Sequence, residues 1–297
     1  MPLIVTLIAA EHEAANLARH AAAVAAALGT ADGPFWLGPI ACDLALDADD
    51  AGAIAATARA ALGGAAVDVV VQGAENRRKR LLVADLEATI IENEMLDELA
   101  DLAGLRERVA AITRRAMNGE IDFAAALAAR VALLAGLEKS VLAAAAARIR
   151  ITAGAAALVA TMRRAGAVTA LVSGGFTIFA ERVAAALGFD HVVANRLEVA
   201  GGRIAGTVRP PIVTGETKRQ VLLSLAAAHA VPMPQTLAVG DGANDLPMLQ
   251  AAGLGVAFRA KPRVAAAARW RLDHADLRAL LYAQGYRQQD FVSPQAT

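Results

Sequence analysis

Three short apolar runs of this sequence each end at residues whose side chains could do chemistry. The runs are short and rich in aliphatic residues, as expected of buried parallel strands. A carboxylate follows the first run, a hydroxyl with two glycines the second, and another carboxylate the third: Leu81 to Ala84 before Asp85, Ala167 to Val172 before Ser173-Gly174-Gly175, and Thr236 to Val239 before Gly240-Asp241. Because ligands of open α/β sheets bind at the carboxyl ends of the strands, these groups are predicted to share one site.

The two carboxylates indicate phosphoryl transfer assisted by a divalent metal ion. A phosphate monoester is an anion that repels a carboxylate nucleophile, so Asp85 could attack only after the phosphoryl oxygens are neutralised. Mg²⁺ is a hard ion that prefers octahedral oxygen ligands. The carboxylates of Asp85 and Asp241 and the backbone carbonyl of Glu87 could supply them, while Asn244 or Asp245 could orient metal-bound waters. The sequence therefore predicts an aspartyl phosphate on Asp85.

Donors for the phosphoryl group are expected on the opposite side of the site. Ser173 can donate its hydroxyl, and Gly174 can donate its backbone N–H because glycine permits a close approach of the backbone. Lys218 adds a compact positive charge that can also hold Asp85 in place. Each of these features alone is common in turns and on solvated surfaces. Their order along one chain is what favours a catalytic site.

In this order, the motifs resemble those of the haloacid-dehalogenase superfamily, and within it those of the phosphoserine phosphatases. The motifs are Asp85-Leu-Glu-Ala-Thr89, Ser173-Gly174-Gly175, Lys218 and Gly240-Asp241-Gly-Ala-Asn244-Asp245. The resemblance runs from about Val69 to Phe291, and stretches that begin at Asn93 and Met117 also match. It implies Mg²⁺-dependent hydrolysis of O-phospho-L-serine to L-serine and phosphate, the last step of serine biosynthesis.

By the same resemblance, residues between the first two motifs recognise the substrate. The residue that matches Glu94 contacts the substrate ammonium, and the residue that matches Arg130 contacts its carboxylate. The charges agree, since Arg forks bidentately onto a carboxylate and Glu pairs with an amine. Met117 and Phe123 are implied to close the pocket and exclude water, although their periodicity fits ordinary helix packing equally well.

One residue departs from the family pattern. The family has Asp where this chain has Glu87, and the resemblance makes this carboxyl the general acid and base. The intrinsic pKa values of Asp and Glu differ by only about 0.4, so reach is the concern, since a misplacement of about 1 Å can cost on the order of 10²-fold. We expect the strand end or the cap to receive the longer side chain. A poorly placed Glu87 would instead favour a phosphotransferase, a phosphatase of another small phosphorylated amino alcohol, or a serine-sensing relative with weakened catalysis.

The remaining pattern predicts an α/β protein with three parts. Alternating strands and helices predict a Rossmann-like, doubly wound parallel sheet over residues 75–92 and 153–297. Residues 93–152 are almost entirely helical in pattern and are predicted to form an inserted α-helical cap. Residues 1–74 alternate strand and helix, with one strand expected from Phe35 to Leu46, and resemble a small ACT-like α+β domain. A structural or dimer-forming role suits this domain as well as serine sensing, so a homodimer is one expectation.

Composition narrows the choice of partners and compartment. The chain has 297 residues, 29 of them basic and 29 acidic, so it lacks the basic surface that nucleic acids or anionic membranes require. The basic run from Arg77 to Arg80 is expected to be a linker or a solvated entry to the strand that follows. The lone Cys42 excludes an internal disulfide framework and fits a reducing compartment. Pro2 to Ala9 lacks a basic leader, so a strand is expected there, no membrane span is predicted, and the protein is expected in the cytoplasm.

Overall fold

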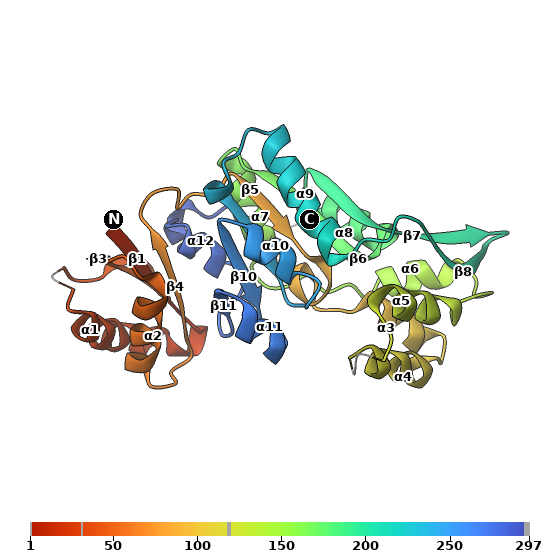
Figure 1. Cartoon of the computed structure of the whole chain (residues 1–297), viewed down its shortest axis with the longest axis horizontal. Helices are drawn as coiled ribbons and strands as arrows, with labels where there is room; N and C mark the ends of the chain where they lie inside the picture. The colour runs from red at the N-terminus through yellow and green to blue at the C-terminus, as the bar shows by residue number, and fades with distance from the viewer. Residues whose placement is uncertain (1, 31, 118–119, 294–297) are drawn as a thin grey trace.

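The computed structural model describes residues 2–30, 32–117 and 120–293, without the side chain of Met117. Its strands form two sheets, one of four strands in the order β2-β3-β1-β4 and one of seven in the order β11-β10-β9-β5-β6-β7-β8. Figure 1 shows the smaller sheet with its two helices at one end of the molecule, the larger sheet in the middle, and a group of helices at the other end. Within these ranges, no helix is long and apolar enough to cross a membrane.

The N-terminal unit, residues 2–73, runs strand, helix, strand, strand, helix, strand. Its elements are β1 (Pro2–Ala9), η1 (Glu11–Asn16), α1 (Leu17–Leu28), β2 (Phe35–Gly38), β3 (Ala41–Asp47), α2 (Ala51–Leu62) and β4 (Val67–Gly73). Strand β1 pairs antiparallel with both β3 and β4. The single strand expected from Phe35 to Leu46 is wrong, because a turn at Pro39 and Ile40 divides it into β2 and β3. Proline lacks a backbone N–H and so interrupts the ladder.

Local signals fix both ends of helix α2. At its start, the Asp50 side chain accepts hydrogen bonds from Gly52 N (2.8 Å) and Ala53 N (3.0 Å). These bonds satisfy N–H groups that have no partner within the helix. At its end, Gly63 adopts a φ of 59°, which glycine takes without steric cost. The helix is thereby held against the small sheet, with Ala58 fully buried.

The core, residues 81–90 and 155–283, is built on the larger sheet. Its strands are β5 (Leu81–Ala84), β6 (Val168–Phe176), β7 (His191–Ala200), β8 (Arg203–Arg209), β9 (Thr236–Gly240), β10 (Leu254–Phe258) and β11 (Trp270–Leu272). Its helices are α7 (Ala155–Arg164), α8 (Thr177–Leu187), α9 (Gly215–Ala228), α10 (Leu246–Ala251), α11 (Pro262–Ala267) and α12 (Ala279–Ala283), with the short turns η2 (Leu86–Ile90), η3 (Met233–Gln235) and, after the core, η4 (Gln288–Asp290). The three apolar runs that precede the chemical residues are confirmed as β5, β6 and β9.

Strand β5 lies at the centre of this sheet and is buried on both faces. Leu82 and Ala84 belong to one hydrophobic cluster, and Leu81 and Val83 belong to the other. Burial on both faces explains why the run is continuously apolar rather than alternating. β5 pairs in parallel with β6 on one side and with β9 on the other.

The order in which strands are added to the sheet reverses at β5. The chain continues from β5 to β6 and β7 on one side, and β9, β10 and β11 follow on the other side. A crevice opens outside the carboxyl ends at such a point, and ligands of open α/β sheets bind there. The segments that follow β5, β6 and β9 therefore meet at one place.

Between Ile91 and Ile151 the chain leaves the core and forms the helical insert. Its helices are α3 (Met95–Leu102), α4 (Arg106–Met117), α5 (Phe123–Ala132) and α6 (Ser140–Ala146). The two connections run side by side, because Ile91 and Ile151 form an antiparallel bridge. The hairpin of β7 and β8 also holds the insert, since Gly136 N donates to Ile204 O (2.9 Å). Figure 1 shows the insert beside this hairpin, at the end of the molecule opposite the N-terminal unit.

The basic run that begins at Arg77 connects β4 to β5, as a linker does, but the expectation of a solvated entry is wrong for two of its residues. Arg77 donates to Asp43 Oδ1 (2.7 Å) and, through Nε, to Ala283 O (3.0 Å). Lys79 is buried and donates to Pro234 O (2.9 Å). The run passes between the N-terminal unit and the core, where its donors satisfy acceptors on both sides. Charge patterning cannot reveal such partners, because they come from distant parts of the chain.

Candidate active site

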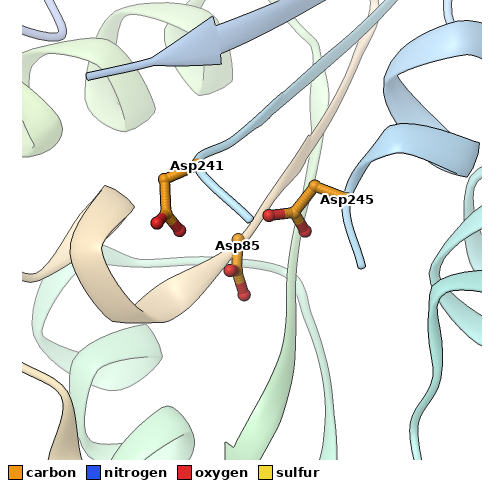
Figure 2. Close-up of side chains that lie close together, drawn as sticks. All are labelled: Asp85, Asp241 and Asp245. Atoms are coloured by element: carbon orange, nitrogen blue, oxygen red, sulfur yellow. The ribbon is translucent and has the colours of Figure 1, made fainter. Parts of the chain in front are cut away.

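Three aspartates meet at the carboxyl edge of the core sheet. Asp85 follows β5, Asp241 follows β9, and Asp245 directly precedes α10. One carboxylate oxygen from each lies within 4.8 Å of the others, and all three residues are buried. Figure 2 shows the carboxylates converging. Burial raises the pKa of Asp85 well above its usual range, and repulsion from Asp245 adds to the rise. Burial also raises the pKa of Asp241 to about 6. The negative charge of the cluster is therefore only partly compensated.

A buried lysine provides that partial compensation. Lys218 lies on α9 and is 0% exposed, and its Nζ is 2.6 Å from Asp85 Oδ1 and 2.7 Å from Asp245 Oδ1. Burial on its own would lower the pKa of this lysine, but the two carboxylates outweigh burial and raise the pKa above its usual value. Helix α9 begins with a capping box formed by Thr214 and Thr217, which orders the turn that carries Lys218. The lysine thus holds both aspartates in place.

The three aspartates fit a hard divalent cation. Carboxylate oxygens are the ligands that Mg²⁺ and Ca²⁺ prefer, and three of them within 4.8 Å can converge on one ion. Lys218 offsets one negative charge of the three. Lys261, whose Nζ is 3.8 Å from Asp241 Oδ2, is largely exposed and so offsets little more. A divalent cation would balance the cluster, so this site could hold a metal ion.

Hydrogen bonds fix the end of β6, which carries Ser173 and the two glycines one strand away from β5. Ser173 is buried, and its Oγ accepts a hydrogen bond from Gly175 N (2.9 Å). Asn195, on β7, donates from Nδ2 to Gly174 O (2.7 Å) and accepts from Val213 N (2.8 Å). Sequence reasoning missed Asn195, although a lone amide inside a β-branched strand pattern was a signal for it. This side chain ties the serine and glycine segment to the loop before α9.

The carboxyl group of Glu87 lies against the backbone of Gly175. A Cβ placed on Gly175 would lie 2.8 Å from Glu87 Oε1 and 2.9 Å from Oε2, so only glycine leaves room for this side chain. Oε1 also accepts a hydrogen bond from Met95 N (3.0 Å), at the start of α3. The neighbouring Ala88 adopts a φ of 51°, which residues with a side chain rarely take, and turns the chain sharply after β5. The Glu87 carboxyl group thus lies between the end of β6 and the start of the insert.

Charged residues of the insert surround this carboxyl group. The pKa of Glu87 is raised to about 8, because burial and the charge of Glu94 raise it more than the Met95 N–H and the charges of Lys218 and Arg130 lower it. Glu94 precedes α3, and Arg130 lies on α5. Arg130 Nε donates to a carbonyl of its own helix (3.3 Å), and its two terminal nitrogens have no partner in the described part of the chain. The insert therefore contributes the carboxyl group of Glu94 and the guanidinium of Arg130, whose terminal nitrogens remain available to a ligand.

Two more of the predicted residues meet at Gly174. A Cβ on Gly174 would lie 3.2 Å from Phe123 Cζ and 3.8 Å from Asn244 Nδ2. The Phe123 ring, at the first turn of α5, therefore reaches from the insert to the core while it stays 39% exposed. Met117 ends α4, and its side chain lies outside the described residues. Asp85, Asp241 and Asp245 form the acidic cluster, and Lys218 contacts it.

Sequence reasoning also missed Lys261 and Thr89. Lys261 follows β10, and its charge opposes the rise that burial produces in the pKa of Asp241. The rule that residues after parallel strands share one edge could have found it, because β10 is the neighbour of β9. Thr89 is fully buried, and its hydroxyl has no hydrogen-bond partner among the described residues. Thr89 is the last residue of the first motif, but its position in the sequence alone did not indicate a function for it.

Comparisons with known proteins agree with this geometry. Residues 82–250 match the sequence model of a family described as haloacid dehalogenase-like hydrolase. A phosphoserine phosphatase of Streptomyces coelicolor is 45% identical over 235 residues, which make up 79% of this chain and 57% of the relative. One of Idiomarina loihiensis is 45% identical over 214 residues, 72% of this chain and 96% of the relative. The crystal structure of a probable phosphoserine phosphatase from Vibrio cholerae, in unliganded form, matches with a TM-score of 0.78 at 30% identity, covering 99% of this chain and 90% of that one.

The extent of these matches differs between relatives. The chain spans little more than half the length of some curated relatives, 57% in the case of the Streptomyces protein. The family match covers more than half of this chain and includes Asp85, Ser173, Lys218 and Asp241. The chain therefore belongs to the haloacid dehalogenase-like hydrolase family, in the branch of the phosphoserine phosphatases.

Proposed function

We propose that this chain hydrolyses O-phospho-L-serine to L-serine and phosphate, the last step of serine biosynthesis. The observation that carries the proposal is the position of Asp85, which a fully buried Lys218 holds within a cluster of three aspartates. A carboxylate nucleophile for a phosphate monoester needs a fixed position and nearby positive charge. The names of the relatives support the choice of substrate.

Mg²⁺ is the proposed cofactor. Asp85 and Asp241 would hold it through their carboxylates, and Glu87 would hold it through its backbone carbonyl. Asp245 would not contact the ion directly but would orient metal-bound waters. When bound, the ion supplies positive charge that neutralises the phosphoryl oxygens and so permits attack by a carboxylate. The crowding of three buried carboxylates around a single buried lysine, Lys218, supports this assignment.

Asp85 is the proposed nucleophile, and Glu87 the proposed general acid and base. A carboxylate oxygen of Asp85 attacks phosphorus, the bond between phosphorus and the serine oxygen breaks, and the Glu87 proton passes to that oxygen. Water then attacks the aspartyl phosphate, Glu87 takes a proton from the water, and the bond from Asp85 to phosphorus breaks to release phosphate. The raised pKa of Glu87, about 8, supports this role because the group is protonated at neutral pH, as the first step requires.

Four other groups are proposed to position the phosphoryl group and the nucleophile. Ser173, the Gly174 N–H and Asn244 would donate to the phosphoryl oxygens, and Lys218 would keep Asp85 aligned. Support comes from the ordered end of β6 and from Asn244, whose amide lies beside Gly174. Donors placed in advance cost no reorganisation when charge develops in the transition state.

Glu87→Gln is expected to lower kcat for O-phospho-L-serine by about 10²- to 10⁴-fold, because an amide can neither donate nor take the required proton. The amide oxygen can still accept the Met95 N–H bond, so the fold should persist. Phosphate release measured at saturating substrate checks this result, with Glu92→Gln, an exposed glutamate, as the matched control. Undiminished turnover in Glu87→Gln would remove the assignment. Phosphoenzyme that accumulates in the unmodified protein and passes its phosphoryl group to an added alcohol would instead favour the phosphotransferase alternative.

The insert is proposed to select the substrate. Glu94 would pair with the substrate ammonium, and Arg130 would pair with its carboxylate through the terminal nitrogens that no described residue occupies. Phe123 would close the pocket over Gly174, and Met117 would line it from α4. The approach of Glu94 and Arg130 to Glu87 supports this arrangement.

Arg130→Gln is expected to lower kcat/KM for O-phospho-L-serine by about 10- to 100-fold, the usual loss of a charge-assisted hydrogen bond. Hydrolysis of p-nitrophenyl phosphate, which has no carboxylate, should change little. The ratio of the two kcat/KM values is the measurement, and Arg108→Gln, an exposed arginine on α4, is the control. If both substrates lose activity equally, Arg130 does not recognise the carboxylate.

The remaining parts of the chain have proposed roles of their own. Residues 93–152 are proposed as the cap, because the insert contributes Glu94, Phe123 and Arg130 to the site. Residues 1–74 are proposed as an ACT-like domain, which the strand order of the N-terminal unit supports. A homodimer and a cytoplasmic location stay predictions.

A further inference from the structure

A cavity lies between the N-terminal unit and the core, away from the acidic cluster. Its volume is about 190 Å³. Arg59 and Asp68 line it from the N-terminal unit, Arg271 lines it from β11, and Asp273 and His274 line it from the segment that follows β11. Figure 1 shows this region, where β4 faces β11. Neither the family motifs nor the proposed reaction uses any of these residues.

Most of the charge around this cavity is already compensated. Asp68 is buried and accepts hydrogen bonds from the backbone N–H groups of Asp273 (2.8 Å), His274 (3.2 Å) and Ala275 (2.9 Å). Arg271 Nε forms an ion pair with Asp273 Oδ2 at 2.9 Å. These contacts also join the two units, since Asp68 belongs to β4 and its donors belong to the core.

Arg59 is the exception. It lies in the last turn of α2 and is half-buried, and its guanidinium has neither a hydrogen-bond nor an ion-pair partner within the part of the chain that the structure describes. Burial and the nearby charge of Arg271 lower the pKa of Arg59, and the charges of Asp273 and Asp68 oppose this fall. Both arginines line the cavity, and only Arg271 has an ion-pair partner.

Size and charge define the molecule that would fit. The cavity, about 190 Å³, has room for a small organic anion. Asp273 and the carbonyl end of α2 both disfavour a second negative charge. A monoanion should therefore bind better than phosphate. A carboxylate matches the fork of a guanidinium and can bond to it through two parallel hydrogen bonds.

We propose that this cavity binds a small monocarboxylate between Arg59 and Arg271. Because one arginine belongs to the N-terminal unit and the other to the core, the ligand would contact both and stabilise their association. Any ligand that binds the folded state alone raises the free energy of unfolding by mass action. This site does not depend on the proposed phosphatase activity, and its ligand need not be the substrate or a product.

Titration of the full chain with acetate tests the proposal, with the arginine Nε–Hε signals read by nuclear magnetic resonance. The signals of Arg59 and Arg271 should shift with one common midpoint, while that of Arg19, an exposed arginine on α1, should not move. In Arg59→Gln and in Arg271→Gln the midpoint should rise at least about tenfold. Arg19→Gln should keep the midpoint of the unmodified protein. A parallel titration with inorganic phosphate should give weaker binding at both arginines.

Two further readings separate a binding site from a structural arginine. Saturating acetate should raise the melting temperature of the unmodified protein and of Arg19→Gln, and should slow hydrogen exchange of the amides of residues 273–275, but should do neither in Arg59→Gln. If Arg59 only stabilises the end of α2, Arg59→Gln would melt earlier but respond to acetate as the unmodified protein does, which would overturn the proposal. Tighter binding of phosphate than of acetate at Arg59 would overturn the assigned ligand class.

Discussion

Asp85→Asn is expected to lower phosphate release from O-phospho-L-serine by more than about 10⁴-fold, the scale on which removal of a covalent nucleophile acts. The amide that replaces the carboxylate cannot form the aspartyl phosphate. The fold should survive, because Lys218 keeps its 2.7 Å bond to Asp245. Removal of one of three crowded carboxylates also relieves repulsion, so the melting temperature of the metal-free protein should not fall.

The assay should compare three proteins in the same buffer. Asp47→Asn is the matched control, since Asp47 is exposed at the end of β3 and far along the chain from the site. Its rate should equal that of the unmodified protein. Acid-quenched samples with labelled substrate should contain phosphoenzyme in the unmodified protein and none in Asp85→Asn. A rate for Asp85→Asn within about tenfold of the unmodified protein would mean that another group attacks phosphorus.

Lys218→Met is expected to abolish turnover and also to destabilise the protein by about 3–5 kcal/mol, the usual cost of leaving a buried charge unpaired. Lys218 is completely buried and contacts two carboxylates, so its removal leaves Asp85 and Asp245 without their cation. Denaturation by urea, followed by linear extrapolation, gives the free energy of unfolding. Lys139→Met, at an exposed lysine, is the control and should change this free energy little.

A double variant separates the two effects of that lysine. Lys218→Met combined with Asp245→Asn removes one unpaired carboxylate, so part of the lost stability should return. The amide at position 245 can still accept the hydrogen bond from Gly242 N (2.9 Å). Turnover should remain abolished, because the cation beside Asp85 is still missing. Equal stability of the single and double variants would contradict a buried ionic network around Lys218.

The sequence predicts the centre of the site well, because Asp85 and Asp241 each directly follow a strand with a strong local pattern and Ser173 lies near the end of a third strand. Leu81–Ala84 is apolar throughout, since β5 is buried on both faces, and Asp85 comes next in the chain. Parallel pairing of β5 with β6 and β9 then brings the following residues together. Nothing beyond local pattern and the rule for carboxyl edges is needed there.

Other features depend on contacts between distant parts of the chain, which local patterns do not encode. Arg77 looks like part of a solvated run, yet its partners are Asp43 in the N-terminal unit and Ala283 in the core. The position of the Glu87 carboxyl depends on the space that Gly175 leaves on a neighbouring strand. Neither the partners of Arg77 nor the space beside Gly175 can be predicted from charge and spacing along the chain.

The measurement that tests the central claim most directly is phosphate release from O-phospho-L-serine, assayed with Mg²⁺, after chelation, and after Mg²⁺ is restored. The cluster of Asp85, Asp241 and Asp245 around Lys218 predicts turnover that is lost on chelation and recovered with the ion. Glu94 and Arg130 predict that phosphoserine is hydrolysed well above other small phosphomonoesters. Turnover that is indifferent to chelation, or absence of turnover on phosphoserine with Mg²⁺ present, would contradict a metal-assisted phosphoserine phosphatase.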